Sequence, residues 1–149
     1  MTKPQLKTGH VALNVTDLAR SIDFYEALFD VEILARSDDE RAWALLGTDG
    51  ALRIALWQQS EGAFATGLPG LHHLSFEVPD VEAVRAAETV LKDLGVEFAY
   101  DGVVAHGEGA GSGGVFFSDP DGVRLEIYTP AGVDGSSAPV KGAPTCGFF

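Results

Sequence analysis

The chain of 149 residues repeats itself once, and this duplication limits its fold more than any other feature of the sequence. The segment HVALNVTD, which starts at His10, matches HLSFEVPD, which starts at His73, at a constant offset of 63 positions. Further along, WALLGTDGALRIALW from Trp43 resembles VFFSDPDGVRLEIYT from Val115. Two copies are too few for a solenoid, so we expect two equivalent half-units that share one sheet system.

Both copies show the same order of elements. Each reads as an alternating strand, a helix that starts at an Asp, a second strand, and a hairpin around an Asp-Gly turn. The second strands are predicted around Val31–Leu34 and Val96–Tyr100. The apolar stripes of the two helices are Leu18, Ile22, Tyr25 and Phe29, and then Val84, Ala87, Leu91 and Leu94. The sequence therefore predicts an α+β fold of two paired βαβββ modules, at about residues 8–60 and 70–130.

Composition narrows the class of protein. The 22 acidic and 10 basic residues give a net charge of −12, which repels phosphate backbones and excludes nucleic acid as a general partner. No apolar run approaches the roughly 18 residues that cross a membrane. The start of the chain lacks an apolar signal segment, and Cys146 alone cannot form an internal disulfide. We expect one cytoplasmic domain over residues 1–130, then an irregular arm over 131–149. It would be a small-molecule enzyme, a small-molecule binder or an interaction module.

Strand alternation predicts an apolar face under the helices and an opposite polar face. The polar face gathers His10, Ala12, Asn14, Arg53, Ala55, Trp57, His73, Ser75, Glu77, Arg124, Glu126 and Tyr128. A solvated outer face is the ordinary interpretation, and a cavity lined for chemistry is the alternative. His10 and His73 begin the first strand of each copy, and Glu126 shares their face. Two imidazoles and a carboxylate favour Fe(II) or Mn(II) with open positions, although Zn(II), Co(II) or Ni(II) would also accept them.

Three segments carry a resemblance to a known family: GHVALNVTDLARSIDFYEALF, LHHLSFEVPDVEAV and FFSDPDGVRLEIY. They resemble the vicinal oxygen chelate superfamily, which includes glyoxalase I, extradiol dioxygenases, fosfomycin-resistance enzymes and bleomycin-binding proteins. The resemblance covers about residues 8–130. It implies a cup-shaped mixed sheet with helices on its outer face, and a divalent metal on residues that correspond to His10, His73 and Glu126. It also implies a small substrate with adjacent oxygens and a homodimer.

The reaction is less closely specified than the fold. Glyoxalase I resembles this chain but supplies a fourth ligand where Ala55 stands here, which argues against a standard glyoxalase I. His106 lies in a segment where extradiol dioxygenases place an active-site histidine, so the resemblance implies a catalytic role for it. A solvated loop histidine is the alternative. Phe116 departs from the tyrosine often found there in those dioxygenases.

Trp57, Arg124 and Tyr128 lie on the predicted polar face and are candidates for substrate contact. Phe116 is a further aromatic candidate, although strand alternation does not place it on that face. Arg124 could equally pair with a carboxylate. The favoured interpretation is a metal-dependent enzyme most like an extradiol-type, ring-cleaving dioxygenase. The alternatives are a glyoxalase-like lyase or isomerase, a thiol transferase of the fosfomycin-resistance type, and an antibiotic-binding resistance protein.

Overall fold

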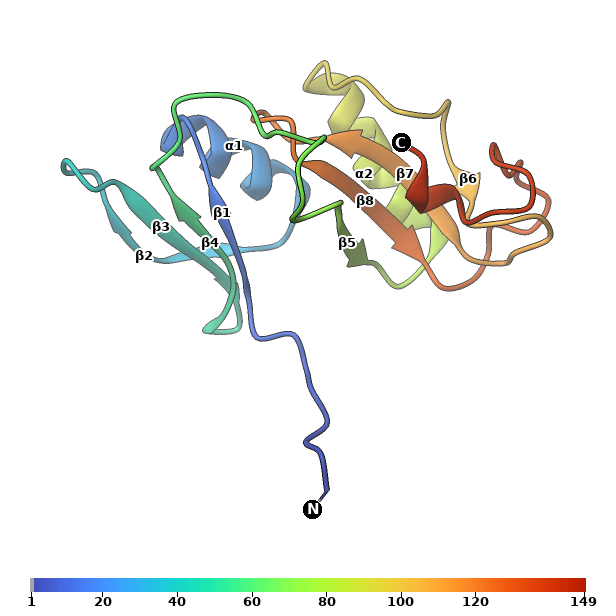
Figure 1. Ribbon diagram of the computed structural model, residues 1–149, viewed down its shortest axis with the longest axis horizontal. Coiled ribbons are helices and arrows are strands. Elements are labelled where there is room, and N and C mark those ends of the chain that lie inside the picture. Colours follow the sequence, from blue (N-terminus) through green and yellow to red (C-terminus); the bar gives the residue numbers. More distant parts are fainter. Residues whose placement is uncertain (1) are drawn as a thin grey trace. The chain divides into compact units, whose positions relative to one another are not determined.

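The computed structural model describes residues 2–149, which form two compact units, one ending at Ala63 and the other running Phe64–Phe149. Each unit contains one four-stranded mixed sheet and one α-helix (Figure 1). The two sheets have the same strand order and the same parallel and antiparallel pairings. The predicted fold class, α+β with two paired βαβββ modules, is therefore confirmed.

The first unit is built as strand, helix and three further strands. Its elements are β1 (Val11–Asn14), α1 (Leu18–Leu28), β2 (Glu32–Ser37), β3 (Trp43–Thr48) and β4 (Ala51–Trp57). In the sheet the order is β1-β4-β3-β2, with β1 parallel to β4. The β3–β4 hairpin turns at Asp49 and Gly50, whose φ angles of 52° and 74° are the left-handed pair of a type I′ turn. Asp-Gly is a favoured sequence for that turn, as the sequence predicts.

The second unit repeats this plan and adds a C-terminal arm. Its elements are β5 (Leu74–Glu77), α2 (Val81–Asp93), β6 (Val104–Ala105), β7 (Gly113–Ser118), β8 (Arg124–Thr129) and the 3-10 turn η1 (Thr145–Gly147). The strand order is β5-β8-β7-β6. Helix α2 packs on β7 and β8 on one side of the sheet, and η1 lies against the other side (Figure 1). This second side is where the candidate site is found.

Both helices begin where the sequence predicts, at an aspartate. The Asp17 carboxylate accepts a hydrogen bond from the Arg20 backbone N–H at 3.0 Å, and Asp80 accepts one from the Ala83 N–H at 2.9 Å. Each cap satisfies one of the N–H groups that a helix start leaves unpaired. Among residues 2–149, neither helix is long and apolar enough to cross a bilayer.

Three local predictions are wrong. The strand expected at Val96–Tyr100 is reduced to one bridge, from Phe98 to Phe117, and the edge strand forms later as β6. The chain turns between them at Gly102, whose φ of +68° breaks the extended run. Leu94 leaves the apolar stripe and is 46% exposed, because α2 ends at Asp93. Finally, His10 and His73 precede β1 and β5 rather than beginning them.

Candidate metal centre

The candidate site is centred on Glu126 in the middle of β8. Strand register places Glu126 beside Ser75 of β5 and opposite Phe116 of β7, so these three side chains share one face. The neighbours of Glu126 along the strand, Leu125 and Ile127, are buried on the helix side. Alternation therefore points Glu126 away from α2. Only 3% of Glu126 is exposed, which is unusual for a carboxylate without a cationic partner.

Two polar side chains lie close to one oxygen of this carboxylate. The Ser75 hydroxyl donates to Glu126 Oε1, and the His106 Nε2 atom lies 3.5 Å from the same oxygen. The other ring nitrogen of His106, Nδ1, lies 3.0 Å from the Ser112 hydroxyl oxygen. Burial pushes the pKa of Glu126 upward, but His106 and Ser75 outweigh it and hold that pKa below its ordinary value. Glu126 is therefore ionised at neutral pH.

The second oxygen of Glu126 is unpaired. Oε2 is buried, and no hydrogen-bond partner for it exists among residues 2–149. A buried charged oxygen without a partner is costly, because it has lost its hydration and gained nothing in return. The arrangement therefore points to a ligand that Oε2 would bind, and a cation is the chemically suitable one.

His73 and Cys146 complete a cluster with Glu126. One ligand atom from each of the three residues lies within 4.8 Å of the other two. Burial lowers the pKa of His73 below its ordinary value despite the nearby carboxylate, so the imidazole is neutral and can bind a metal through a ring lone pair. Burial and the charge of Glu126 both raise the pKa of the Cys146 thiol. Nitrogen, oxygen and sulfur donors in one cluster, together with an unpaired oxygen on its carboxylate, fit a divalent cation.

The C-terminal arm brings Cys146 to this position. Thr145 is buried, its backbone N–H donates to the His106 carbonyl at 2.9 Å, and its hydroxyl donates to the Ala105 carbonyl at 2.6 Å. At the end of the arm, the Phe149 ring lies 5.0 Å from the Phe116 ring and 5.5 Å from the His73 ring. The arm therefore covers the Glu126 side of the sheet at two points.

The sequence prediction missed Cys146. Its only signal was an apolar end, TCGFF, on an otherwise polar and glycine-rich tail, and no periodicity linked that end to a strand or a helix. His106, in contrast, is a predicted residue that the structure brings to Glu126.

The remaining predicted residues of the second unit surround this cluster. Phe116 is fully buried opposite Glu126. Arg124 lies on β8, two positions before Glu126, and opposite Ser118 of β7. The Tyr128 hydroxyl donates to Glu77 at 3.2 Å, and its ring centroid lies 5.2 Å from that of His106. These three side chains all belong to the face that carries the cluster.

Two predicted residues belong to the first unit and are described within it. His10 is exposed and directly precedes β1. Trp57 ends β4, is partly exposed and pairs across the hairpin with Trp43, with ring centroids 6.0 Å apart. The structure thus groups His73, His106 and Glu126, whereas His10 and Trp57 remain predictions for this site.

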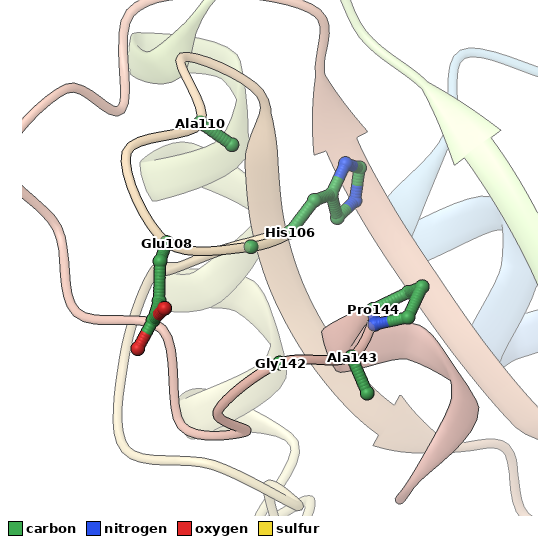
Figure 2. Close-up of a pocket in the computed structure, with 7 residues that line it drawn as sticks. His106, Glu108, Ala110, Gly142, Ala143 and Pro144 are labelled. Carbon is green, nitrogen blue, oxygen red and sulfur yellow. The ribbon is translucent and has the colours of Figure 1, made fainter.

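A pocket of about 450 Å³ opens beside His106. Figure 2 shows it between the loop that carries His106 and Glu108 and the part of the arm that carries Ala143 and Pro144. Pockets for small organic molecules fall at roughly 300–1,000 Å³, so this volume suits a small ligand. His106 thus contributes to the pocket and also lies next to the Glu126 carboxylate.

Comparison with known proteins identifies the family. Residues 7–127 match the model of the glyoxalase/bleomycin resistance protein/dioxygenase superfamily. The chain belongs to this superfamily, as its motifs predict. A solved glyoxylase/bleomycin resistance protein/dioxygenase domain from Frankia sp. EAN1pec has a TM-score of 0.70 at 27% identity, over 85% of this chain and 98% of that one. The fosfomycin resistance protein FosX from Listeria monocytogenes, solved as a mutant with Mn(II), has a TM-score of 0.63 at 21% identity, over 83% of this chain and 91% of that one.

Curated relatives differ in activity. Catechol-2,3-dioxygenase of Bacillus subtilis is 27% identical over 80% of this chain, but the match spans only 40% of the dioxygenase's own length. Metallothiol transferase FosB of Bacillus licheniformis is 29% identical over 83% of this chain and 75% of the transferase. A trivalent organoarsenical cleaving enzyme of Bacillus sp. MD1 is 29% identical over 95% and 83%. These relatives agree on the superfamily and disagree on the reaction.

Proposed function

We propose that this protein is a metal-dependent enzyme that acts on a small substrate with two adjacent oxygens, most like an extradiol-type dioxygenase. The observation that carries the proposal is the buried Glu126, which has one unpaired oxygen, lies in a cluster with His73, and has its other oxygen next to His106. A buried carboxylate with neutral imidazole beside it has the donor set of a divalent metal site. The similarity to catechol-2,3-dioxygenase supports the choice of reaction.

His10, His73 and Glu126 are the proposed ligands, with Fe(II) or Mn(II) as the favoured metal. Because His10 precedes β1 and His73 precedes β5, the two histidines are equivalent positions of the duplication. This equivalence supports including His10 among the ligands, and a homodimer is the proposed assembly. The proposal treats residues 1–130 as one domain, followed by the arm.

The chain's own residues would prepare the reaction. A divalent metal held by His10, His73 and Glu126 would supply Lewis-acid stabilisation of the anionic form of the substrate oxygens. Ser75 orients the Glu126 carboxylate by donating to Oε1. If the Ser112 hydroxyl donates to His106 Nδ1, the His106 Nε2 atom carries the ring proton beside Glu126 Oε1 and can give that proton to the substrate. The Phe116 ring excludes water, and Trp57, Arg124 and Tyr128 are the remaining proposed substrate contacts.

The test is the metal content of protein purified without oxygen, followed by oxygen uptake with a panel of catechols. Stoichiometric iron with catechol-dependent uptake is the expected result. The His106→Ala variant should keep its metal and lose activity by about 100-fold or more, because general acid–base catalysis contributes roughly 10²–10⁴-fold. Zinc or nickel with no oxygen uptake would contradict the dioxygenase proposal and leave the metal site standing.

A thiol transferase is the second candidate. The match covers 75% of FosB but only 40% of catechol-2,3-dioxygenase. This chain is therefore closer in length to FosB, which favours a transferase. Consumption of a small thiol in the presence of fosfomycin and Mn(II), without oxygen uptake on catechols, would support it. Tight antibiotic binding with no turnover would instead indicate a binding protein.

A further inference from the structure

We propose that the Cys146 thiol is a metal ligand, and that together with His73 and Glu126 it forms a sulfur-containing site that selects Fe(II), Co(II) or Zn(II) over Mn(II). This inference rests on the proposed metal site at His73 and Glu126. It adds a ligand from the C-terminal arm, which is outside the duplicated modules, and it makes the arm part of the site.

The three donors are close enough for one ion. Their ligand atoms lie within 4.8 Å of one another, each residue contributing one atom. Zinc binds nitrogen, oxygen and sulfur at roughly 2.0–2.3 Å, so tetrahedral ligands are separated by about 3.3–3.8 Å. A contraction of about 1 Å at the longest separation would close the site around a cation. Side-chain rotation of a half-buried cysteine can supply that movement.

The backbone holds Cys146 beside the carboxylate from both directions. Before it, Thr145 is fixed by hydrogen bonds from its N–H to His106 and from its hydroxyl to Ala105, and its own carbonyl accepts one from the Tyr100 hydroxyl at 3.2 Å. After it, Phe149 packs edge-on against Phe116. The thiol is therefore delivered by an anchored turn.

The unpaired carboxylate oxygen is the independent reason to expect a cation there. Glu126 Oε2 is buried and unpaired among residues 2–149, and Glu126 is in the same cluster as the sulfur. A carboxylate and a thiolate next to each other repel unless a positive ion lies between them. On binding the cation, the thiol would lose its S–H proton to solvent and bind as thiolate.

A sulfur ligand changes which metal the site prefers. Thiolate favours zinc and other soft or borderline ions, whereas carboxylate, carbonyl and water favour manganese. With Cys146 bound, the site should discriminate against Mn(II). Without it, the remaining nitrogen and oxygen ligands should be less selective. Cys146 is thus a specificity-determining residue for the metal.

The experiment is a titration of the metal-free, reduced protein with Co(II), read by absorption. Cobalt bound by any of these ligands gives visible bands, and a sulfur ligand adds a charge-transfer band in the near ultraviolet. The wild type should show both, and Cys146→Ser should keep the visible bands and lose the ultraviolet band. Ser137→Ala is the matched arm control, because within residues 2–149 Ser137 bonds to the body through its backbone carbonyl, which accepts from the Ala105 N–H and is kept in the variant. It should match the wild type.

Competition between Zn(II) and Mn(II) gives a second readout. Cys146→Ser and Cys146→Ala should each weaken zinc binding by at least about 10-fold. Removing a residue that only hydrogen-bonds to a metal ligand already costs roughly 10–100-fold in affinity, and removing a ligand should cost at least as much. Manganese binding should change much less. Circular dichroism would confirm that both variants are folded.

Visible cobalt bands in the wild type with no ultraviolet band would overturn the inference and leave the proposed metal site intact. Equal zinc affinity in wild type and both cysteine variants would also overturn it. No cobalt binding at all would overturn the inference together with the metal-dependent function.

Discussion

The two modules place different side chains on the equivalent row of their two sheets. In the first unit the register aligns Ala12, Ala55 and Leu45 across β1, β4 and β3. In the second unit the equivalent row is Ser75, Glu126 and Phe116 across β5, β8 and β7. Since strand order and pairing are identical, the difference in chemistry comes from side chains on one face. One row is inert, and the other carries a buried charge.

The helix sides of the two sheets do not show this difference. Ile54 precedes Ala55 and Leu125 precedes Glu126, and both are buried on the side opposite to their neighbours. Both helices also start at an aspartate cap. The side chains that face the helix therefore stabilise the fold in both modules. The alternate side chains, on the opposite face, include candidate metal ligands in the second module.

The first and largest expected effect comes from copying the inert row into the second module. Glu126→Ala should weaken metal binding by more than about 100-fold, because it removes the carboxylate of the cluster, which is charged before any metal binds. Equilibrium dialysis with Zn(II) and Mn(II) would measure this. Glu126→Gln is the control for shape, since its amide oxygen can still accept from Ser75 while the negative charge is lost. Full metal binding by either variant would show that the two rows do not differ in the way we infer.

The duplicated part of this comparison could be predicted from the sequence. The offset between His10 and His73 and the alternation of Leu125, Glu126 and Ile127 predict which strands pair and which side chains share a face. These signals are periodic, because a strand side chain points to the same face every second residue. The hairpin at Asp49 and Gly50 was equally predictable, since few sequences favour two consecutive left-handed residues.

The particular contacts of the part outside the repeat could not be predicted, although its apolar end indicates docking. Thr145 and Cys146 reach the site through hydrogen bonds to Ala105 and His106, and the tail has no periodicity that indicates these partners. Strand ends were also missed, because alternation continues through His10 and His73 although ladder pairing has not yet begun there. Long-range contacts of irregular segments depend on tertiary packing, for which a single sequence provides no local pattern.

The second prediction concerns the helix sides, which we expect to behave alike. Ile54 and Leu125 are 2% and 0% exposed, so Ile54→Ala and Leu125→Ala should each lower the free energy of unfolding by about 2–5 kcal/mol. Urea denaturation would measure both. Leu68→Ala is the control, because Leu68 is 68% exposed and should change stability by less than about 0.5 kcal/mol. A large loss in only one of the two core variants would show that the modules differ on both faces.

The third and smallest effect is expected at the helix caps. Asp17→Ala and Asp80→Ala should each cost about 1 kcal/mol, since each removes one carboxylate-to-N–H hydrogen bond of nearly equal length at the start of a helix. Asp17→Asn and Asp80→Asn should lose only a few tenths of a kcal/mol, because asparagine also caps well. Thermal melting of the four variants would test this. Equal losses at the two alanine variants would show that the modules are equivalent at their helix starts as well. A loss confined to Asp80→Ala would mean that only the second module depends on its helix cap, the module whose sheet carries Glu126.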